Sequence, residues 1–84
     1  MEDLKILREN IDKIDDEIVT LLLKRMACSK AIGEVKKSLS VPVTDLKREN
    51  EIINRLTLNK KESEAELIKE VYKLIFAYSR SLQK

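Results

Sequence analysis

One apolar pattern runs through the first half of the chain without interruption by a proline. Its members recur at spacings of three, four or seven residues and comprise Leu4, Leu7, Ile11, Ile14, Ile18, Leu21, Cys28, Ile32 and Val35. This spacing places the side chains on one face of a helix, so we predict a helix from Leu4 to about Lys37. At 1.5 Å per residue, such a helix is a rod about 50 Å long.

A rod of this length does not fit inside a monomeric domain of 84 residues. A compact domain of that size has a radius of gyration near 12 Å and is therefore roughly 30 Å across. Two shorter helices cannot cover the whole apolar face, and a large exposed apolar face marks an interaction surface. We therefore expect a homodimer in which the long helices of two chains pair.

The segment SLSVPV, residues 38–43, ends the first helix. Pro42 lacks an N–H group and disfavours the helical conformation in the residue before it. Thr44 or Asp45 is a natural N-cap for a second helix, which we expect to end near Asn59.

The third helix is predicted from SEAE, residues 63–66, where a serine precedes a glutamate by three residues as in a capping box. The helix then carries Ile68, Val71, Tyr72, Ile75, Ser79 and Leu82 on one side. We expect an all-α fold with one long, one short and one medium helix, in a single domain over residues 1–84. Alternatively, the chain is one domain of a longer bifunctional protein.

The composition argues against several classes of protein. Seventeen basic and fifteen acidic residues alternate along the chain and give a net charge of only +2, unlike the basic stripe of most nucleic-acid binders. No apolar run has the length of a membrane span or a signal peptide. A single cysteine, Cys28, cannot form an intrachain disulfide, so we expect a cytoplasmic protein. The chain has no histidine, the commonest metal ligand, and we expect no metal site.

Several polar residues occupy the apolar faces of the predicted helices. Arg25, Ser29 and Lys36 share one face of the long helix, and Arg25 and Lys36 differ by about 20° in direction around its axis. Both long side chains could bind one anionic molecule between them, or each could extend to solvent at the helix edge. On the third helix, Ser79 and Gln83 continue the apolar line, or form the polar fringe of a fraying terminus.

The second helix begins with a cluster of charges. Asp45, Arg48 and Glu49 lie within its first turn, where the helix dipole and free N–H groups favour anions. Asp45 alone is most simply a cap. Polar interruptions on the inner faces of all three helices together suit a small dianionic ligand.

Arg8 indicates a site shared between two chains. It precedes Arg25 by seventeen residues and therefore lies about 25 Å from it along a straight helix. If two long helices cross antiparallel near residues 18–22, Arg8 of one chain arrives opposite residues 28–36 of the other. A site between two subunits thus becomes possible.

These residues resemble the all-helical chorismate mutases of the AroQ class over essentially the whole chain. The matching motifs are LREN with Arg8, IDKIDDEIVTLLLKR with Arg25, AIGEVK with Lys36, PVTDLKRE with Asp45, Arg48 and Glu49, and SRSLQ with Ser79 and Gln83. Each motif alone is weak, whereas their order and spacing are specific. The resemblance implies an intertwined homodimer without a cofactor that rearranges chorismate to prephenate, a step toward phenylalanine and tyrosine.

The resemblance also implies a role for each matching residue. Arg25 and the other subunit's Arg8 would bind the two substrate carboxylates, with assistance from Ser79. Lys36 and Gln83 would donate to the ether oxygen that becomes negative as its bond to carbon breaks. The corner formed by Glu49, the backbone of Asp45 and the supporting Arg48 would hold the ring hydroxyl. Such a rearrangement needs a folded substrate and well-placed donors, and needs neither a nucleophile nor a proton transfer.

Three features of the sequence allow more than one interpretation. Arg80 stands where relatives often carry an apolar residue, and it could crowd the pocket or point outward. Gly33 lies inside the long helix, where it permits a close packing contact or the approach of a ligand, or is simply a glycine tolerated near the helix end. Two other functions are compatible with the sequence. One is an isochorismate–pyruvate lyase of the same fold, and the other is a catalytically silent helical dimerisation or regulatory module.

Overall fold

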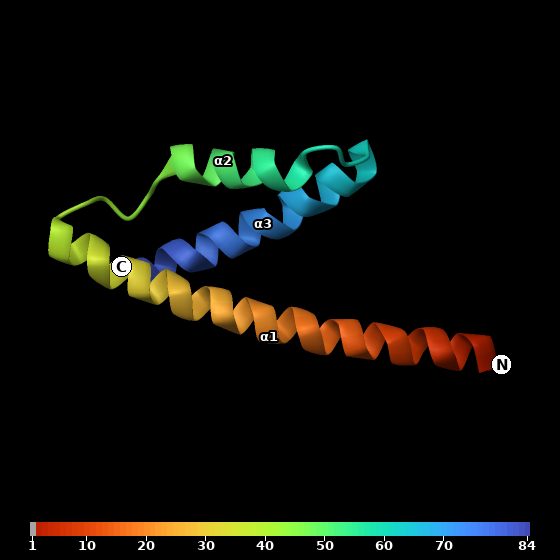
Figure 1. Cartoon of the computed structure of the whole chain (residues 1–84). Coiled ribbons are helices and arrows are strands. Elements are labelled where there is room, and N and C mark those ends of the chain that lie inside the picture. Colours follow the sequence, from red (N-terminus) through yellow and green to blue (C-terminus); the bar gives the residue numbers. More distant parts are fainter. Residues whose placement is uncertain (1) are drawn as a thin grey trace.

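The computed structural model describes residues 2–84, which form three helices joined by two short loops (Figure 1). They are α1 (Glu2–Leu39), α2 (Leu46–Thr57) and α3 (Glu62–Gln83). The described residues outside these helices lie in turns and loops. The prediction of an all-α fold with one long, one short and one medium helix is therefore confirmed.

The end of α1 has a specific backbone structure. Ser40 adopts the left-handed conformation with φ of 57°. The N–H of Val41 donates to the carbonyl of Lys36 at 2.9 Å, and the N–H of Ser40 donates to the carbonyl of Lys37 at 3.2 Å. This pair of bonds is the Schellman arrangement, which satisfies two carbonyls of the last turn. The helix thus stops before Pro42, as the sequence predicts.

The helix α2 starts after Asp45, one of the two predicted caps. The Oδ1 atom of Asp45 accepts a hydrogen bond from the N–H of Arg48 at 3.0 Å. The helix ends at Thr57, and Asn59 then adopts the left-handed conformation with φ of 59°. The predicted boundaries of the second helix therefore agree with the structure to within two residues.

The predicted start of α3 is wrong by two residues. The helix begins at Glu62 with Lys61 as its N-cap, and Ser63 lies inside its first turn. Glu64, rather than Glu66, folds back and accepts a hydrogen bond from the N–H of Lys61 at 3.1 Å. Lys61 is extended, and the acidic side chains that follow it suit the positive end of the helix dipole. The helix thus begins directly after the extended Lys61, with Glu62 and Glu64 in its first turn.

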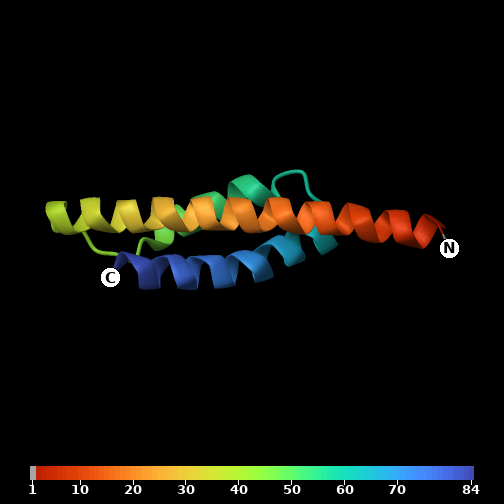
Figure 2. The ribbon, with the colours of Figure 1, turned by 90° about the horizontal axis from the view of Figure 1, so that it is seen from below.

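The three helices form an elongated molecule of 57 × 26 × 15 Å with a radius of gyration of 16.3 Å. The helix α3 packs along the C-terminal half of α1, and α2 packs on α3. Figure 1 shows that α3 diverges from the N-terminal half of α1, and Figures 1 and 2 both show that the end of this half projects beyond the other two helices. Among the described residues, no helix is long and apolar enough to cross a membrane.

The core is correspondingly small. Ile75 and Phe76 of α3 are the buried apolar residues among those described, and the Phe76 and Tyr72 rings pack edge to face at a centroid distance of 5.6 Å. The apolar face of α1 is largely bare, with about half of each side chain exposed at Leu4, Leu7, Ile11, Ile14 and Ile18. The expected long apolar face is thus present, and most of it is uncovered.

Candidate active site

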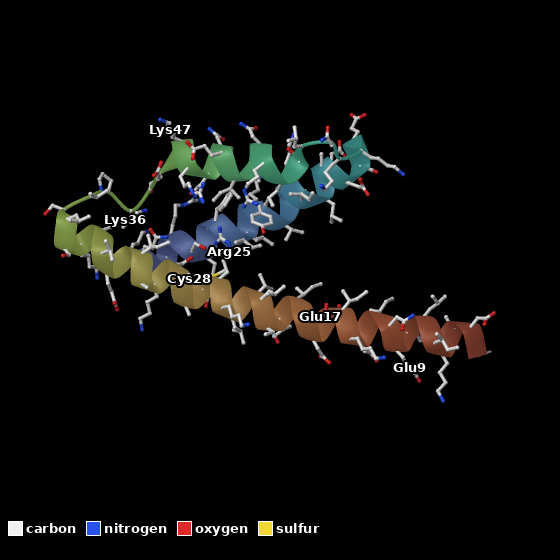
Figure 3. The ribbon with its side chains drawn as sticks, viewed as in Figure 1. Glu9, Glu17, Arg25, Cys28, Lys36 and Lys47 are labelled. Atoms are coloured by element: carbon white, nitrogen blue, oxygen red, sulfur yellow. The ribbon has the colours of Figure 1, made fainter. Side chains whose placement is uncertain are left out.

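A cavity of about 450 Å³ lies between the C-terminal half of α1, the N-terminal half of α2 and the end of α3. Of the predicted site residues, all but Arg8 line it, namely Arg25, Lys36, Asp45, Arg48, Glu49, Ser79 and Gln83. Figure 3 shows Arg25 and Lys36 on the side of α1 that faces the other two helices, whereas Lys47 lies on the far side of α2. Residues from distant parts of the sequence therefore converge on one space.

Arg25 is held in the cavity and does not extend to solvent. Its Nη1 atom donates to the Oγ of Ser79 at 2.8 Å, and its guanidinium lies 5.7 Å from the ring centroid of Phe76 and 5.8 Å from that of Tyr72. Contacts of this kind between a cation and aromatic rings are attractive. Ser29 donates to the same Ser79 oxygen at 3.1 Å, and both serines are buried. Arg25 is thus held by three side chains of α3.

Lys36 joins three parts of the chain. Its Nζ atom donates to the carbonyl of Val43 at 2.8 Å and to the Oε1 of Gln83 at 2.9 Å. An ammonium group has three donors, so one N–H is left for a ligand. Because Oε1 of Gln83 accepts from Lys36, the amide NH₂ of the same side chain is free to donate as well. Gln83 is the last residue of α3, and its side chain is buried in the cavity.

The start of α2 contributes groups of both charges. The Oδ1 of Asp45 serves as the helix cap, so part of this carboxylate is engaged by the backbone. Arg48 forms an ion pair of 3.6 Å with Glu51, and both side chains are more than half exposed. Such exposed pairs contribute little stability. Arg48 is therefore free to turn toward a ligand.

Glu49 forms a short ion pair with Arg80, a residue whose orientation the sequence left open. The Nη1 atom of Arg80 lies 2.8 Å from Oε1 and 2.6 Å from Oε2 of Glu49. Both side chains are less than one third exposed. Arg80 follows buried Phe76 by four residues, which places it on the same face of the helix. That spacing was the signal in the sequence for its inward direction.

Arg8 is separate from this cavity within one chain. It lies on the projecting half of α1, where Figure 3 also shows Glu9. Its distance from Arg25 along the helix is about 25 Å, beyond the reach of an arginine side chain. Arg8 could therefore take part only through a second copy of the chain.

The charges of the cavity favour an anion. Four cationic residues line it, Arg25, Lys36, Arg48 and Arg80, and two carboxylates oppose them, which gives a formal charge of +2. Apolar side chains form part of the wall and include Ile32, Val43, Ile52 and Phe76. In such a partly apolar environment, interactions between charges are stronger than in water. The described residues contain no group of acids and thiols that could hold a metal ion.

Three helices around a cationic cavity define a class of all-helical proteins with a pocket suited to a small anion. Within this class, residues 7–84 match the family described as chorismate mutase type II, and the chain belongs to that family. The family resemblance given by the motifs is therefore confirmed. Chorismate mutases are isomerases.

Relatives of known name extend the comparison. The chain is 39% identical to a bifunctional chorismate mutase/prephenate dehydratase of Aquifex aeolicus, and it covers 25% of that protein. It is 29% identical to a chorismate mutase of Methanocaldococcus jannaschii and covers 87% of it. All of the present chain aligns in both cases.

A solved structure has the same fold. A conserved hypothetical protein from Pyrococcus furiosus superposes with a TM-score of 0.83 at 38% identity, and the match covers 100% of this chain and 99% of the other. The chain therefore spans a small part of one relative and nearly the whole of another.

Proposed function

We propose that the protein is a chorismate mutase, which rearranges chorismate to prephenate in the biosynthesis of phenylalanine and tyrosine. The observation that carries the proposal is the pair formed by Lys36 and Gln83, 2.9 Å apart in a cavity with a formal charge of +2. Two donors side by side in such a cavity suit an oxygen that gains negative charge. Membership of the chorismate mutase family supports the same reaction.

The chemistry requires that chorismate be held in a folded conformation while one C–O bond breaks and one C–C bond forms. Lys36 and the amide of Gln83 donate to the ether oxygen as negative charge develops there. In other enzymes, removal of one such donor costs about 3–4 kcal/mol of transition-state stabilisation. Two donors would thus provide most of the roughly 8 kcal/mol that a 10⁶-fold acceleration needs.

The remaining residues bind and orient the substrate. Arg25, steadied by Ser79, binds one carboxylate, and Arg48 supports the corner that holds the ring hydroxyl. Glu49 accepts a hydrogen bond from the ring hydroxyl at the corner beside Asp45. Confinement between these groups supplies the rest of the acceleration, because it removes the entropy cost of folding the substrate.

The second carboxylate is bound by Arg8 across the interface of a homodimer. The bare apolar face on the projecting half of α1 supports this assembly, since an exposed patch of that extent marks an interaction surface. Two such helices that cross antiparallel would bring Arg8 of one chain to the cavity of the other. We further propose that the 84 residues act as one catalytic domain in the cytoplasm, where the exposed thiol of Cys28 stays reduced.

The proposal is tested by incubating the purified protein with chorismate and identifying the product by chromatography and mass spectrometry. We expect loss of chorismate with equimolar formation of prephenate, and no pyruvate. A Lys36→Met protein purified in parallel controls for contaminating mutase of the expression host. Equal rates for the two proteins, or release of pyruvate, would contradict the proposal.

A further inference from the structure

The glycine of the chain, Gly33, lies where α1 meets the end of α3. It is buried within the helix, and its φ angle is not in the positive range that only glycine adopts readily. A glycine in a helix interior is less favourable than an alanine. Backbone conformation therefore gives no reason for a glycine here, whereas the atoms around it do.

That space is filled by the backbone of Gln83. A Cβ atom at position 33 would lie 2.6 Å from the Cα of Gln83, and 3.0 Å from both its Cβ and its carbonyl oxygen. Carbon atoms in contact prefer separations of about 3.5–4.0 Å. The nearest atom belongs to the main chain, so no side-chain rotation relieves the clash. An alanine would push the end of α3 away by about 1 Å.

The same residue of α3 supplies a group of the site. Gln83 accepts a hydrogen bond from Lys36, which follows Gly33 by three residues and lies on the same side of α1. Gln83 is also the last residue of α3, where a helix would otherwise fray. The contact with Gly33 and the bond to Lys36 both hold this residue against α1.

We propose that Gly33 is a positioning residue for the reaction. By omitting a side chain, it lets the backbone of Gln83 rest on α1, so that the amide stands beside the Lys36 ammonium. This inference rests on the proposed function, because it concerns a donor that acts on the ether oxygen. A displacement of about 1 Å in a catalytic group can lower a rate by about 100-fold.

The test compares Gly33→Ala with wild type. We expect kcat to fall by about 10- to 100-fold with a smaller change in KM, and the melting temperature to fall as well. If Gly33 were only a tolerated helix glycine, alanine would raise the melting temperature, because it is the better helix former. Glu34→Ala, an exposed neighbour on α1, is the matched control and should keep kcat within about twofold of wild type.

A double variant separates position from stability. In a Gln83→Ala background, Gly33→Ala should still lower the melting temperature, because the main-chain clash persists. It should not lower kcat further, because the amide it would displace is already absent. Losses of kcat that multiply in the double variant would overturn the positioning role.

A measurement on the wild-type protein keeps the inference testable if Gly33→Ala does not fold. We expect a nuclear Overhauser effect between the α-protons of Gly33 and Gln83, because the two backbones are in contact. Its absence would overturn the close approach. Both this effect and the sign of the change in melting temperature are independent of chorismate, so they can hold even if wild type forms no prephenate.

Discussion

On the N-terminal half of α1, Leu7, Ile11 and Ile14 expose more than half of their surface, whereas Ser29 on the C-terminal half is only 4% exposed. The two halves belong to one helix with one apolar periodicity. The C-terminal half is covered by α3 and lines the cavity, whereas α3 diverges from the N-terminal half among the described residues. A single chain thus covers one half of α1 and leaves the apolar face of the other, open half exposed.

The largest effect is expected in the covered half, at Lys36. Lys36→Met removes the cationic donor and also its bonds to Val43 and Gln83. We expect kcat for chorismate to fall about 1000-fold, at the upper end of what loss of one such donor causes. Steady-state kinetics measure this effect, and Lys37→Met, on an exposed neighbour, is the control. A loss below tenfold would mean that the covered half does not hold the reacting oxygen.

The next prediction concerns the open half, at Arg8. If Arg8 binds a carboxylate in the cavity of the other subunit, Arg8→Ala should lower kcat/KM about 100-fold, although it touches no cavity within its own chain. Lys13→Ala, an exposed residue on the opposite side of the projecting half, is the control.

Mixing subunits distinguishes the two halves directly. When Arg8→Ala and Arg25→Ala chains are unfolded and refolded together, each mixed dimer has one site with both arginines. With equal amounts of the two chains, about half of the dimers are mixed, and each mixed dimer has one of its two sites intact. We therefore expect activity to return to roughly a quarter of wild type. If it does not return although mixed dimers form, Arg8 serves no site across the interface.

A smaller effect is expected at Arg80. Arg80→Met leaves the largely buried Glu49 carboxylate without its cation, so we expect kcat/KM to fall about tenfold. Arg80→Lys should recover part of the loss, because lysine restores the charge without the guanidinium geometry. Arg55→Met, on an exposed residue of α2, controls for loss of positive charge. A fully active Arg80→Met protein would show that Glu49 needs no support.

The smallest effect is thermal. If a second copy covers the open half, the melting temperature should rise by a few degrees for each tenfold increase in protein concentration. Ile14→Glu places a charge on the exposed apolar face and should remove this dependence. Calorimetry on both proteins measures it, and a concentration-independent melting temperature in wild type would contradict the dimer.

The sequence predicted the helices well because periodicity reports the direction of a side chain around a helix axis. It therefore found Arg25, Lys36, Ser79 and Gln83 on inward faces, and the structure brings them together in one cavity.

Contacts between helices could not be predicted in the same way. Whether Arg80 meets Glu49 depends on how α2 lies on α3, which periodicity does not contain. The choice between a tolerated glycine and a close contact at Gly33 likewise needed the position of Gln83. The predicted start of α3 was wrong because two possible caps, Lys61 and Ser63, are each followed by a glutamate three residues later. In the structure Lys61 is the cap, and Glu64 accepts the hydrogen bond from its N–H.

Lys36 also links the length of the loop after α1 to the geometry of the cavity. Its carbonyl accepts the bond that ends the helix, and its ammonium binds the carbonyl of Val43 only seven residues later. Surface loops generally accept insertions at little thermodynamic expense. Here an added residue between Ser40 and Val43 would move the anchor of the ammonium. A change in loop length that leaves the fold intact is then expected to lower the activity of the enzyme.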